Sequence, residues 1–500
     1  MNKNLLQKPT QFFTKKNTWS KTAATLLFFI LVCVNVTQAQ SPNLAWAKSM
    51  GGINNDESKG VAVDGAGNVY TTGRFAGTVD FDPNAGVFNL TSVGSNDIFI
   101  TKFDTTGNLV WAKCIGGTSD DLGNSIAVDA SGNVYTTGYF VGTADFDPNA
   151  GISNLTSATL RDIFVSKLNA SGNLVWAKRI GGTGDDIGYS IAVDATGNIY
   201  TTGAFQITVD FNPNASVLNL TSTGNYDIFV SKLNAAGNLV WAKAMGNATS
   251  NDIGNSIAID ATGNVYTTGY FQGTVDFDPN AGVLNLTSAG NADIFVSKLG
   301  ATGNLVWAKS MGGTSNDFGN SIAVDASGNV YTTGYFGGTV DFDPNAGDLN
   351  LTSTGFLDIF VSKLNATGNL VWAKAMGGTT NVVGFGITVD ATGNVYITGY
   401  FQGIVDFDPS AGISNLTASG STDIFVSKLA STGNFAWAKS MGGISNDFGS
   451  SIAVDAIGNV YTTGSFGSTV DFDPNARVSN LTSFGGDDIF VHKMKVTARK

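Results

Sequence analysis

Short loops rich in aspartate and asparagine are the residues of this sequence best placed to do chemistry. Each full copy reads Asp-Phe-Asp-Pro-Asn-Ala-Gly, so oxygen-bearing side chains alternate at its first, third and fifth positions. That spacing resembles the start of an EF-hand loop, and hard oxygen ligands suit calcium. The full pattern predicts calcium ligands at Asp80, Asp82, Asn84, Asp145, Asp147, Asn149, Asp276, Asp278, Asn280, Asp341, Asp343 and Asn345.

The same loops also fit plain turn chemistry. Their Gly comes one position later than in an EF-hand loop, Pro occupies the fourth position, and no Glu closes the loop. Asp can cap a turn, Pro fixes φ, and Gly permits the next bend. Both interpretations stay open, and calcium is the one cofactor that the sequence suggests. If calcium binds, we expect the weakest binding in the copy where Asn212 replaces the second Asp.

Catalytic chemistry finds few candidates. The one His, His492, stands where other copies of its segment have Ser, so neither a nucleophilic triad nor a zinc site can be assembled. The one Glu, Glu57, lies beside Lys59 and predicts a salt bridge. Carboxylates recur in similar surroundings along the chain, whereas an acid and a base need unlike surroundings. We therefore predict no catalytic residues and a protein that is not an enzyme.

A second acidic motif, Asn-Asp-x-Gly or Asp-Asp-x-Gly, recurs at 120–123, 185–188, 251–254, 316–319 and 446–449. Its side chains could bind cations or sugar hydroxyls, or could bond their own backbone in turns. One copy reads Asn381-Val382-Val383 instead. That copy predicts a more apolar sector suited to contact with a partner.

These loops belong to a long repeat, which determines the fold class. The tripeptide Trp-Ala-Lys occurs seven times, at intervals of 65 or 66 residues. One unit, 256–312, contains four segments rich in strand formers, joined in part by Asp-Ala-Thr-Gly-Asn and Gly-Ala-Thr-Gly-Asn turns. Four antiparallel strands per unit predict an all-β, seven-bladed β-propeller. A linear β-solenoid is the alternative.

The chain ends favour a closed ring. The segment 43–50 has the sequence of a fourth strand, whereas the last unit stops after its third strand. The N-terminal strand can therefore pair into the last blade, which removes the open sheet edge. The aromatic residues of the Trp-Ala-Lys and Tyr-Thr-Thr-Gly-Tyr-Phe segments are predicted to pack between blades, with a sugar-binding platform as the alternative.

The segments 125–140 and 321–336 both read SIAVDASGNVYTTGYF. With the repeat around them, they resemble the bacterial seven-bladed β-propeller repeat family of exported proteins. The resemblance covers residues 41–500. It implies an extracytoplasmic propeller, secreted or at the cell surface, and it implies no particular reaction. The C-terminal anchoring domain of many such proteins is not found here, which puts cell-surface anchoring in doubt.

The first 39 residues have the pattern of a secretory signal peptide. A basic start is followed by an apolar run at 23–36 and a small residue at Ala39. We therefore predict a signal peptide at 1–39, a single propeller at 40–500, and no membrane span after cleavage. An uncleaved anchor is the alternative. Removal of the segment leaves 22 basic and 39 acidic residues, a net charge of −17, which argues against nucleic acid as a partner.

Successive strands of a blade run in opposite directions, so the sequence predicts that the ring has two unlike faces. All short turns should lie on one face and all long connections on the other, and loops on a rigid scaffold are where binding usually resides. We predict a monomeric, exported binding or structural propeller that contacts a glycan or an extracellular protein through the long-loop face, with similar blades giving multivalent contacts. The alternatives are a glycan lyase or hydrolase at the channel mouth and a passive structural propeller.

Overall fold

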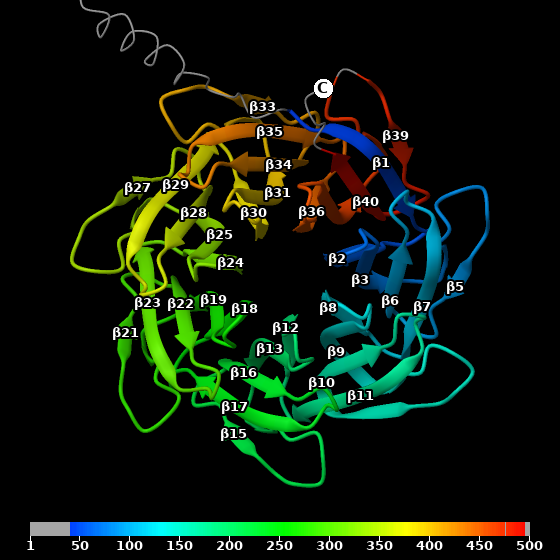
Figure 1. Cartoon of the computed structure of the whole chain (residues 1–500), viewed down its shortest axis with the longest axis horizontal. Helices are drawn as coiled ribbons and strands as arrows, with labels where there is room; N and C mark the ends of the chain where they lie inside the picture. The colour runs from blue at the N-terminus through cyan, green and yellow to red at the C-terminus, as the bar shows by residue number, and fades with distance from the viewer. Residues whose placement is uncertain (1–40, 476, 496–500) are drawn as a thin grey trace, which may run out of the picture. The chain divides into compact units, whose positions relative to one another are not determined.

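The computed structural model describes residues 41–475 and 477–495, which form an all-β ring (Figure 1). The strands of the ring pair antiparallel in groups of four, called blades and numbered 1 to 7 in chain order, and outer hairpins link some of these groups into larger sheets. The predicted signal peptide at 1–39 lies outside the described residues. Within the described ranges, no helix has the length and apolarity that crossing a membrane would need.

The first strand of each blade lies nearest the centre of the ring (Figure 1). These innermost strands are β2 (Glu57–Val63), β8 (Leu122–Val128), β12 (Ile187–Val193), β18 (Ile253–Ile259), β24 (Phe318–Val324), β30 (Val382–Val389) and β36 (Asp447–Val454). Each contacts the innermost strands of the blades on either side, and β36 contacts β2. The inner layer of the ring is therefore continuous.

The two middle strands of each blade carry most of the core. The second strands are β3 (Val69–Phe75), β9 (Val134–Asp145), β13 (Ile199–Phe205), β19 (Val265–Phe271), β25 (Val330–Phe336), β31 (Val395–Phe401) and β37 (Val460–Phe466). The third strands are β6 (Asp97–Phe103), β10 (Asn154–Leu168), β16 (Asp227–Leu233), β22 (Asp293–Leu299), β28 (Asp358–Leu364), β34 (Asp423–Leu429) and β40 (Asp488–Lys495).

The fourth strands form the outer layer, and one of them comes from the start of the ring. They are β7 (Leu109–Gly117), β11 (Leu174–Gly182), β17 (Leu239–Met245), β23 (Leu305–Gly313), β29 (Leu370–Gly378), β35 (Phe435–Met441) and β1 (Asn43–Met50). Strand β1 pairs antiparallel with β40, from Asn43 opposite Lys495 to Met50 opposite Ile489. The predicted β-propeller architecture and the pairing of the N-terminal strand into the last blade are confirmed.

A small outer hairpin between the second and third strands is present in every blade. It is formed by β4 (Thr78–Asp80) with β5 (Asn89–Thr91), β14 (Thr208–Asp210) with β15 (Asn219–Thr221), β20 (Thr274–Asp276) with β21 (Asn285–Thr287), β26 (Thr339–Asp341) with β27 (Asn350–Thr352), β32 (Ile404–Asp406) with β33 (Asn415–Thr417) and β38 (Thr469–Asp471) with β39 (Asn480–Thr482). In blade 2, β9 and β10 are long enough to include it.

The hydrophobic core lies between neighbouring blades. Tyr70 and Trp111 of blade 1 pack with Phe140 and Phe164 of blade 2, and equivalent clusters join the other blades. The indole of Trp46 also donates a hydrogen bond to the Thr105 carbonyl of the next blade, at 3.2 Å. Packing between blades, predicted for these repeated aromatic residues, is confirmed.

Short turns on one face fix the register of each blade. In the turn at 64–68, Asp64 accepts hydrogen bonds from the backbone N–H groups of Ala66 and Asn68, both at 2.9 Å, and Gly67 has a φ of 84°. Only Gly adopts such a φ without strain. We call this side, which carries 64–68 and its equivalents, the short-turn face. The opposite side carries 51–56, 76–96 and their equivalents, and is called the long-loop face.

Candidate functional site

The loops predicted to bind calcium are built as hydrogen-bonded turns. Asp80 Oδ1 accepts from the backbone N–H groups of Asp82 and Phe88, at 3.0 and 2.8 Å, and Asp82 Oδ1 accepts from that of Asn84 at 3.0 Å. Lys48 Nζ then donates to Asn84 Oδ1 at 2.6 Å. The loop oxygens therefore stabilise the turn, and the amide oxygen already has a cationic partner.

The other three complete loops repeat this arrangement. Their Asn oxygens accept from a lysine of the preceding blade, in the pairs Lys113 with Asn149, Lys243 with Asn280 and Lys309 with Asn345. In residues 41–475 and 477–495, no group of three or more His, Cys, Asp or Glu side chains is arranged to hold a metal ion. The hydrogen bonds support the turn interpretation, and calcium binding stays a prediction.

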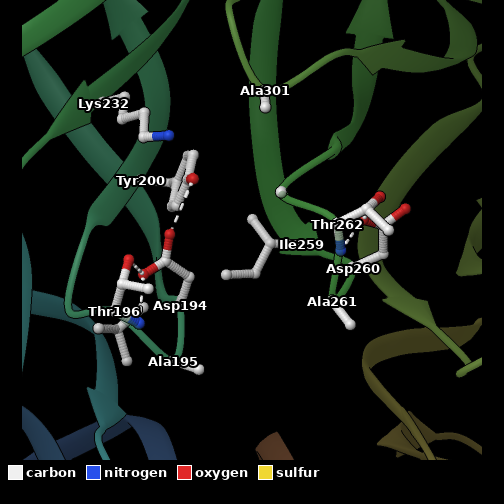
Figure 2. Close-up of a pocket in the computed structure, with 12 residues that line it drawn as sticks. Asp194, Ala195, Thr196, Tyr200, Lys232, Ile259, Asp260, Ala261, Thr262 and Ala301 are labelled. Atoms are coloured by element: carbon white, nitrogen blue, oxygen red, sulfur yellow. Dashed lines mark hydrogen bonds between the residues drawn. The ribbon is translucent and has the colours of Figure 1, made fainter.

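A groove on the short-turn face lies between blades 3 and 4 and has a volume of about 450 Å³ (Figure 2). Partial burial of Asp194 is outweighed by hydrogen bonds from Asn198 and Thr196, which lower its pKa to about 2. Tyr200 donates to the same carboxylate at 3.1 Å, and Lys232 Nζ lies 4.9 Å from the centre of the Tyr200 ring. The polar groups of the groove are thus used within the protein.

A similar groove of about 360 Å³ lies between blades 2 and 3, and the Tyr–Lys contact recurs in other blades. Repetition and internally satisfied polar groups indicate a structural joint between blades. A site specific to this protein is therefore expected where the blades differ.

The blades differ in the central channel, a cavity of about 190 Å³ bordered by all seven innermost strands. At one equivalent position of those strands the residues are Lys59, Asn124, Tyr189, Asn255, Asn320, Phe385 and Ser450. Ligand pockets for small molecules commonly measure 300–1,000 Å³. The channel is therefore narrow for a ligand, and its mouth is the better candidate.

Serine side chains next to the channel form hydrogen bonds between neighbouring inner strands, and these bonds are absent at two positions of the described chain. Ser321 Oγ accepts from the Ile387 backbone N–H of the next blade at 3.3 Å, and four other serines make the equivalent bond. Gly60 and Gly386 occupy the two remaining positions. A Cβ on Gly386 would lie 3.2 Å from the Ile452 nitrogen, the group that lacks a serine partner.

We expect Gly386→Ser to stabilise the protein, because it adds the missing hydrogen bond. The gain should be about 1 kcal/mol, or roughly 2 °C in Tm. Gly384→Ser is the matched control on the same strand, and it should lower Tm because its Cβ would lie 2.7 Å from Thr333 Oγ1. Thermal unfolding followed by circular dichroism measures both, and an unchanged or lower Tm for Gly386→Ser would contradict the prediction.

Aromatic side chains follow the long-loop end of the channel from blade 4 to blade 7. Phe318 lies 4.4 Å from Tyr270 of the previous blade and 5.0 Å from Tyr335, between ring centroids. Tyr400 lies 5.7 Å from Phe385 and 5.2 Å from Phe448 of the next blade. These half-buried or exposed rings are called the aromatic arc: Tyr270, Phe318, Tyr335, Phe385, Tyr400 and Phe448.

Charged residues occupy the same level of the mouth in blades 1 to 3. This charged sector comprises Glu57, Lys59, Arg74, Asp120, Arg161 and Asp185. Glu57 pairs with Lys59 at 2.7 Å, as predicted, and also with Arg74 at 2.9 Å. Burial acts to raise the pKa of Glu57, but these two cations hold that pKa below its usual value.

Tyrosines connect the remaining acids of the charged sector. Tyr139 donates to Asp120 at 2.8 Å, and Tyr226 donates to Asp185 at 3.3 Å. Burial, together with these carboxylates, raises the pKa of both tyrosines to about 12, so both phenols are protonated at neutral pH. The mouth therefore combines apolar rings on one side with fixed hydrogen-bonding groups on the other.

The Asn-Asp-x-Gly motif places a buried carboxylate between blades. Asp121 is fully buried and accepts from the backbone N–H groups of Gly117 and Val141, at 2.8 and 3.0 Å. A second buried carboxylate, Asp97, begins the third strand of blade 1, and its Oδ1 has no hydrogen-bond partner within the described chain. Burial, the main cause, and repulsion by Asp97 raise the pKa of Asp121 to about 7.

This carboxylate pair recurs at six of the seven contacts between blades. The pairs are Asp97 with Asp121, Asp162 with Asp186, Asp227 with Asp252, Asp293 with Asp317, Asp423 with Asp447 and Asp488 with Asp56. The alternative that these Asp side chains bind surface ligands is therefore wrong for the second residue of the motif, because it is buried.

The prediction of an apolar partner sector at Val382 and Val383 is also wrong. Their side chains are 0% and 3% exposed, so neither lies on the surface, and Val382 packs in the cluster between blades 5 and 6. His492 is likewise a core residue. Its Nε2 lies 3.1 Å from the Phe472 carbonyl oxygen, and burial lowers its pKa to about 4.

An all-β ring of antiparallel blades around a narrow channel defines a β-propeller protein. The comparisons agree, because five segments match the family described as Beta-propeller repeat (SBBP): residues 46–74, 110–139, 175–204, 240–270 and 294–335. These five segments therefore carry the β-propeller repeat of that family.

Two relatives were found by sequence. An uncharacterized WD repeat-containing protein of Acanthamoeba polyphaga mimivirus is 26% identical over 519 residues, covering 87% of this chain and 37% of the relative. The regulatory protein FlaEY of Caulobacter vibrioides is 23% identical over 424 residues, covering 79% and 42%. The chain thus spans less than half the length of both. Among solved structures, the WD40 β-propeller domain of Doa1 is similar with 10% identity, coverage of 91% and 97%, and a TM-score of 0.40.

Proposed function

We propose that the chain is an extracytoplasmic, seven-bladed, monomeric propeller that binds a saccharide, without catalysis, at the channel mouth on its long-loop face. The observation that supports this function is the aromatic arc, because rings at an accessible mouth offer flat apolar surface to the C–H faces of a sugar. Aromatic residues with a few placed polar groups are the usual lining of a ligand site. The predicted signal peptide supports export.

The charged sector favours binding over hydrolysis. A glycosidase needs a carboxylic acid that stays protonated near neutral pH to act on the leaving group. Glu57, by contrast, is held ionised by Lys59 and Arg74, and the acids that remain protonated, such as Asp121, are buried between blades. A single mouth also predicts one saccharide per molecule, whereas binding through the repeated outer loops would give several.

We expect Phe385→Ala and Tyr400→Ala each to weaken saccharide binding at least tenfold, because each removes a ring from the aromatic arc. A tenfold loss corresponds to about 1.4 kcal/mol. A glycan array with residues 41–500 identifies the bound saccharide, and calorimetric titration measures its affinity and stoichiometry.

The matched control is Phe88→Ala, which removes a ring that is 42% exposed in the outer hairpin loop of blade 1. It should leave affinity unchanged. Binding that is insensitive to both arc variants would exclude the mouth as the site, a stoichiometry of several saccharides would favour the outer loops, and an array without any bound glycan would favour a protein partner or a passive structural role.

A further inference from the structure

The other two cations of the charged sector both pair with Glu57, whereas Arg161 has no carboxylate within ion-pair distance (4.0 Å) among the described residues. Arg161 lies in β10 of blade 2, and its guanidinium carbon is 4.7 Å from the centre of the Tyr139 ring, a cation–π distance. The other arginines of the described strands, Arg74 and Arg179, each pair with a carboxylate.

The backbone around Arg161 is firmly held, so the side chain has a defined origin. Its N–H donates to Asp185 Oδ1 at 3.3 Å, and its carbonyl accepts from the Asp186 N–H at 2.9 Å. Tyr226 occupies the other oxygen of Asp185. Both oxygens of Asp185 are thus used, by the backbone and by a phenol, which leaves the guanidinium donors for another acceptor.

Besides Tyr139, on whose ring it packs, Arg161 is close enough to Tyr189 and Tyr226 to influence their ionisation. Burial is the main cause that raises the pKa of Tyr139, Tyr189 and Tyr226, and the charge of Arg161 opposes the rise in all three. Tyr189 also lines the channel. The guanidinium therefore lies at the channel mouth, partly desolvated by aromatic rings, where a charge-assisted hydrogen bond is stronger than in open water.

The position is specific to blade 2. The equivalent residues of the other blades are Asn96, Tyr226, Ala292, Leu357, Thr422 and Asp487. The other blades fold without arginine at this position, so the fold does not explain why blade 2 has Arg161. Packing on Tyr139 alone would be served by an apolar side chain such as that of Leu357.

A planar guanidinium matches a carboxylate with two parallel hydrogen bonds. The net charge of −17 without residues 1–39 repels a polyanion at long range, but screening within about 8 Å at physiological salt leaves a local contact intact. We propose that Arg161 binds the carboxylate of a single acidic sugar residue, a hexuronate, while the neutral part of the saccharide lies on the aromatic arc. This inference rests on the proposed function.

The test compares matched saccharides on the intact propeller, residues 41–500. The probes are glucose, galactose and mannose trisaccharides, each with and without oxidation of C6 to a carboxylate at the non-reducing end. We expect the oxidised form of one pair to bind at least tenfold more tightly, with an advantage that falls as salt is raised. Arg161→Gln should abolish the tighter binding of the oxidised form and change the affinity for the neutral form by less than twofold. Arg161→Lys should keep part of the preference for the oxidised form.

Lys178→Gln is the control, because it removes one positive charge at the outer edge, where Lys178 donates to Asn214. This variant should change neither the affinity for the oxidised saccharide nor the affinity for the neutral one. A preference for the uronate that survives Arg161→Gln would overturn the inference, as would equal binding of both forms, and in both cases saccharide binding itself would stand. Failure of every probe to bind would overturn the inference, whereas the proposed function is overturned only if the glycan array is also without any bound glycan.

Discussion

Removal of residues 41–51 is expected to open the ring and to lower Tm by roughly 10 °C or more. The change deletes the outer strand of blade 7, including the buried Met50 and the Trp46 indole that bonds to Thr105 of blade 1. Loss of a large buried apolar side chain alone costs about 2–5 kcal/mol. It also leaves one edge of β40 unpaired, and an exposed edge pairs with other chains.

Thermal unfolding and light scattering measure the two consequences, lower stability and self-association. The matched control restores the missing strand from the other end. A copy of residues 300–311, which supplies a turn and an outer strand in blade 4, replaces residues 495–500 of the truncated chain. This variant should recover most of the lost stability and remain monomeric. A truncated chain as stable as the full one would contradict ring closure by β1.

The sequence predicted the propeller because its signals are repeated. A period of 65 residues, four strand-like segments and glycine turns recur in each unit, so each unit reports on the same structure. Closure by 43–50 followed from the unequal ends of the repeat.

The channel mouth could not be predicted in the same way, because its residues are the exceptions to the repeat. Tyr270 and Phe318 are far apart in sequence, and only the contact between blades 4 and 5 brings their rings to 4.4 Å. The repeat did contain one signal. In the segment Tyr-Thr-Thr-Gly-Tyr-Phe, the residue at the second Tyr position differs between units. The first Tyr position, such as Tyr266, is buried in every unit. A position that varies within a repeat is a candidate for function.

The carboxylate pairs were missed for a related reason. Asp97 and Asp121 belong to different motifs, and each has the appearance of a turn residue. Aspartate is rarely fully buried in proteins. Only the packing of one blade on the next excludes water from both carboxylates.

These pairs lead to the second expected result, a fall in Tm of roughly 10 °C between pH 5 and pH 8. Eight buried carboxyls have raised pKa values: about 7 for Asp121, Asp186, Asp252, Asp447 and Asp488, and about 6 for Asp56, Asp293 and Asp317. Burial is the main cause in each. Differential scanning calorimetry between pH 5 and pH 8 measures the change.

The sign follows from proton binding. An acid whose folded pKa is raised binds protons more tightly in the native state, so its contribution is complete below pH 4 and is lost as pH rises through 6 to 7. Between pH 5 and pH 8 a pKa of about 7 corresponds to a loss of roughly 3 kcal/mol of stability, and a pKa of about 6 to a loss of roughly 1 kcal/mol. The lowered pKa of His492 acts in the opposite direction, by about 2 kcal/mol at pH 5. Two of the eight carboxyls therefore outweigh the histidine.

Asp97→Asn should reduce this pH dependence. The asparagine oxygen can keep the hydrogen bond from the Val93 N–H, now made to Asp97 Oδ2 at 2.9 Å, while its NH2 replaces the unpartnered Oδ1 and can donate toward Asp121. Because one buried negative charge is removed and the other gains a donor, Tm at pH 8 should rise by a few degrees, with little change at pH 5.

The contact between blades 5 and 6 provides the matched control. There Asp358 begins the third strand, but Val382 takes the place of the second carboxylate, and Asp358 already accepts from the Thr354 N–H and hydroxyl at 2.8 and 3.0 Å. Asp358→Asn removes a buried charge but relieves no repulsion, so it should gain less stability at pH 8 than Asp97→Asn. Equal shifts for Asp97→Asn and Asp358→Asn at every pH would show that burial of single carboxyls, and not their pairing across blades, controls the pH dependence.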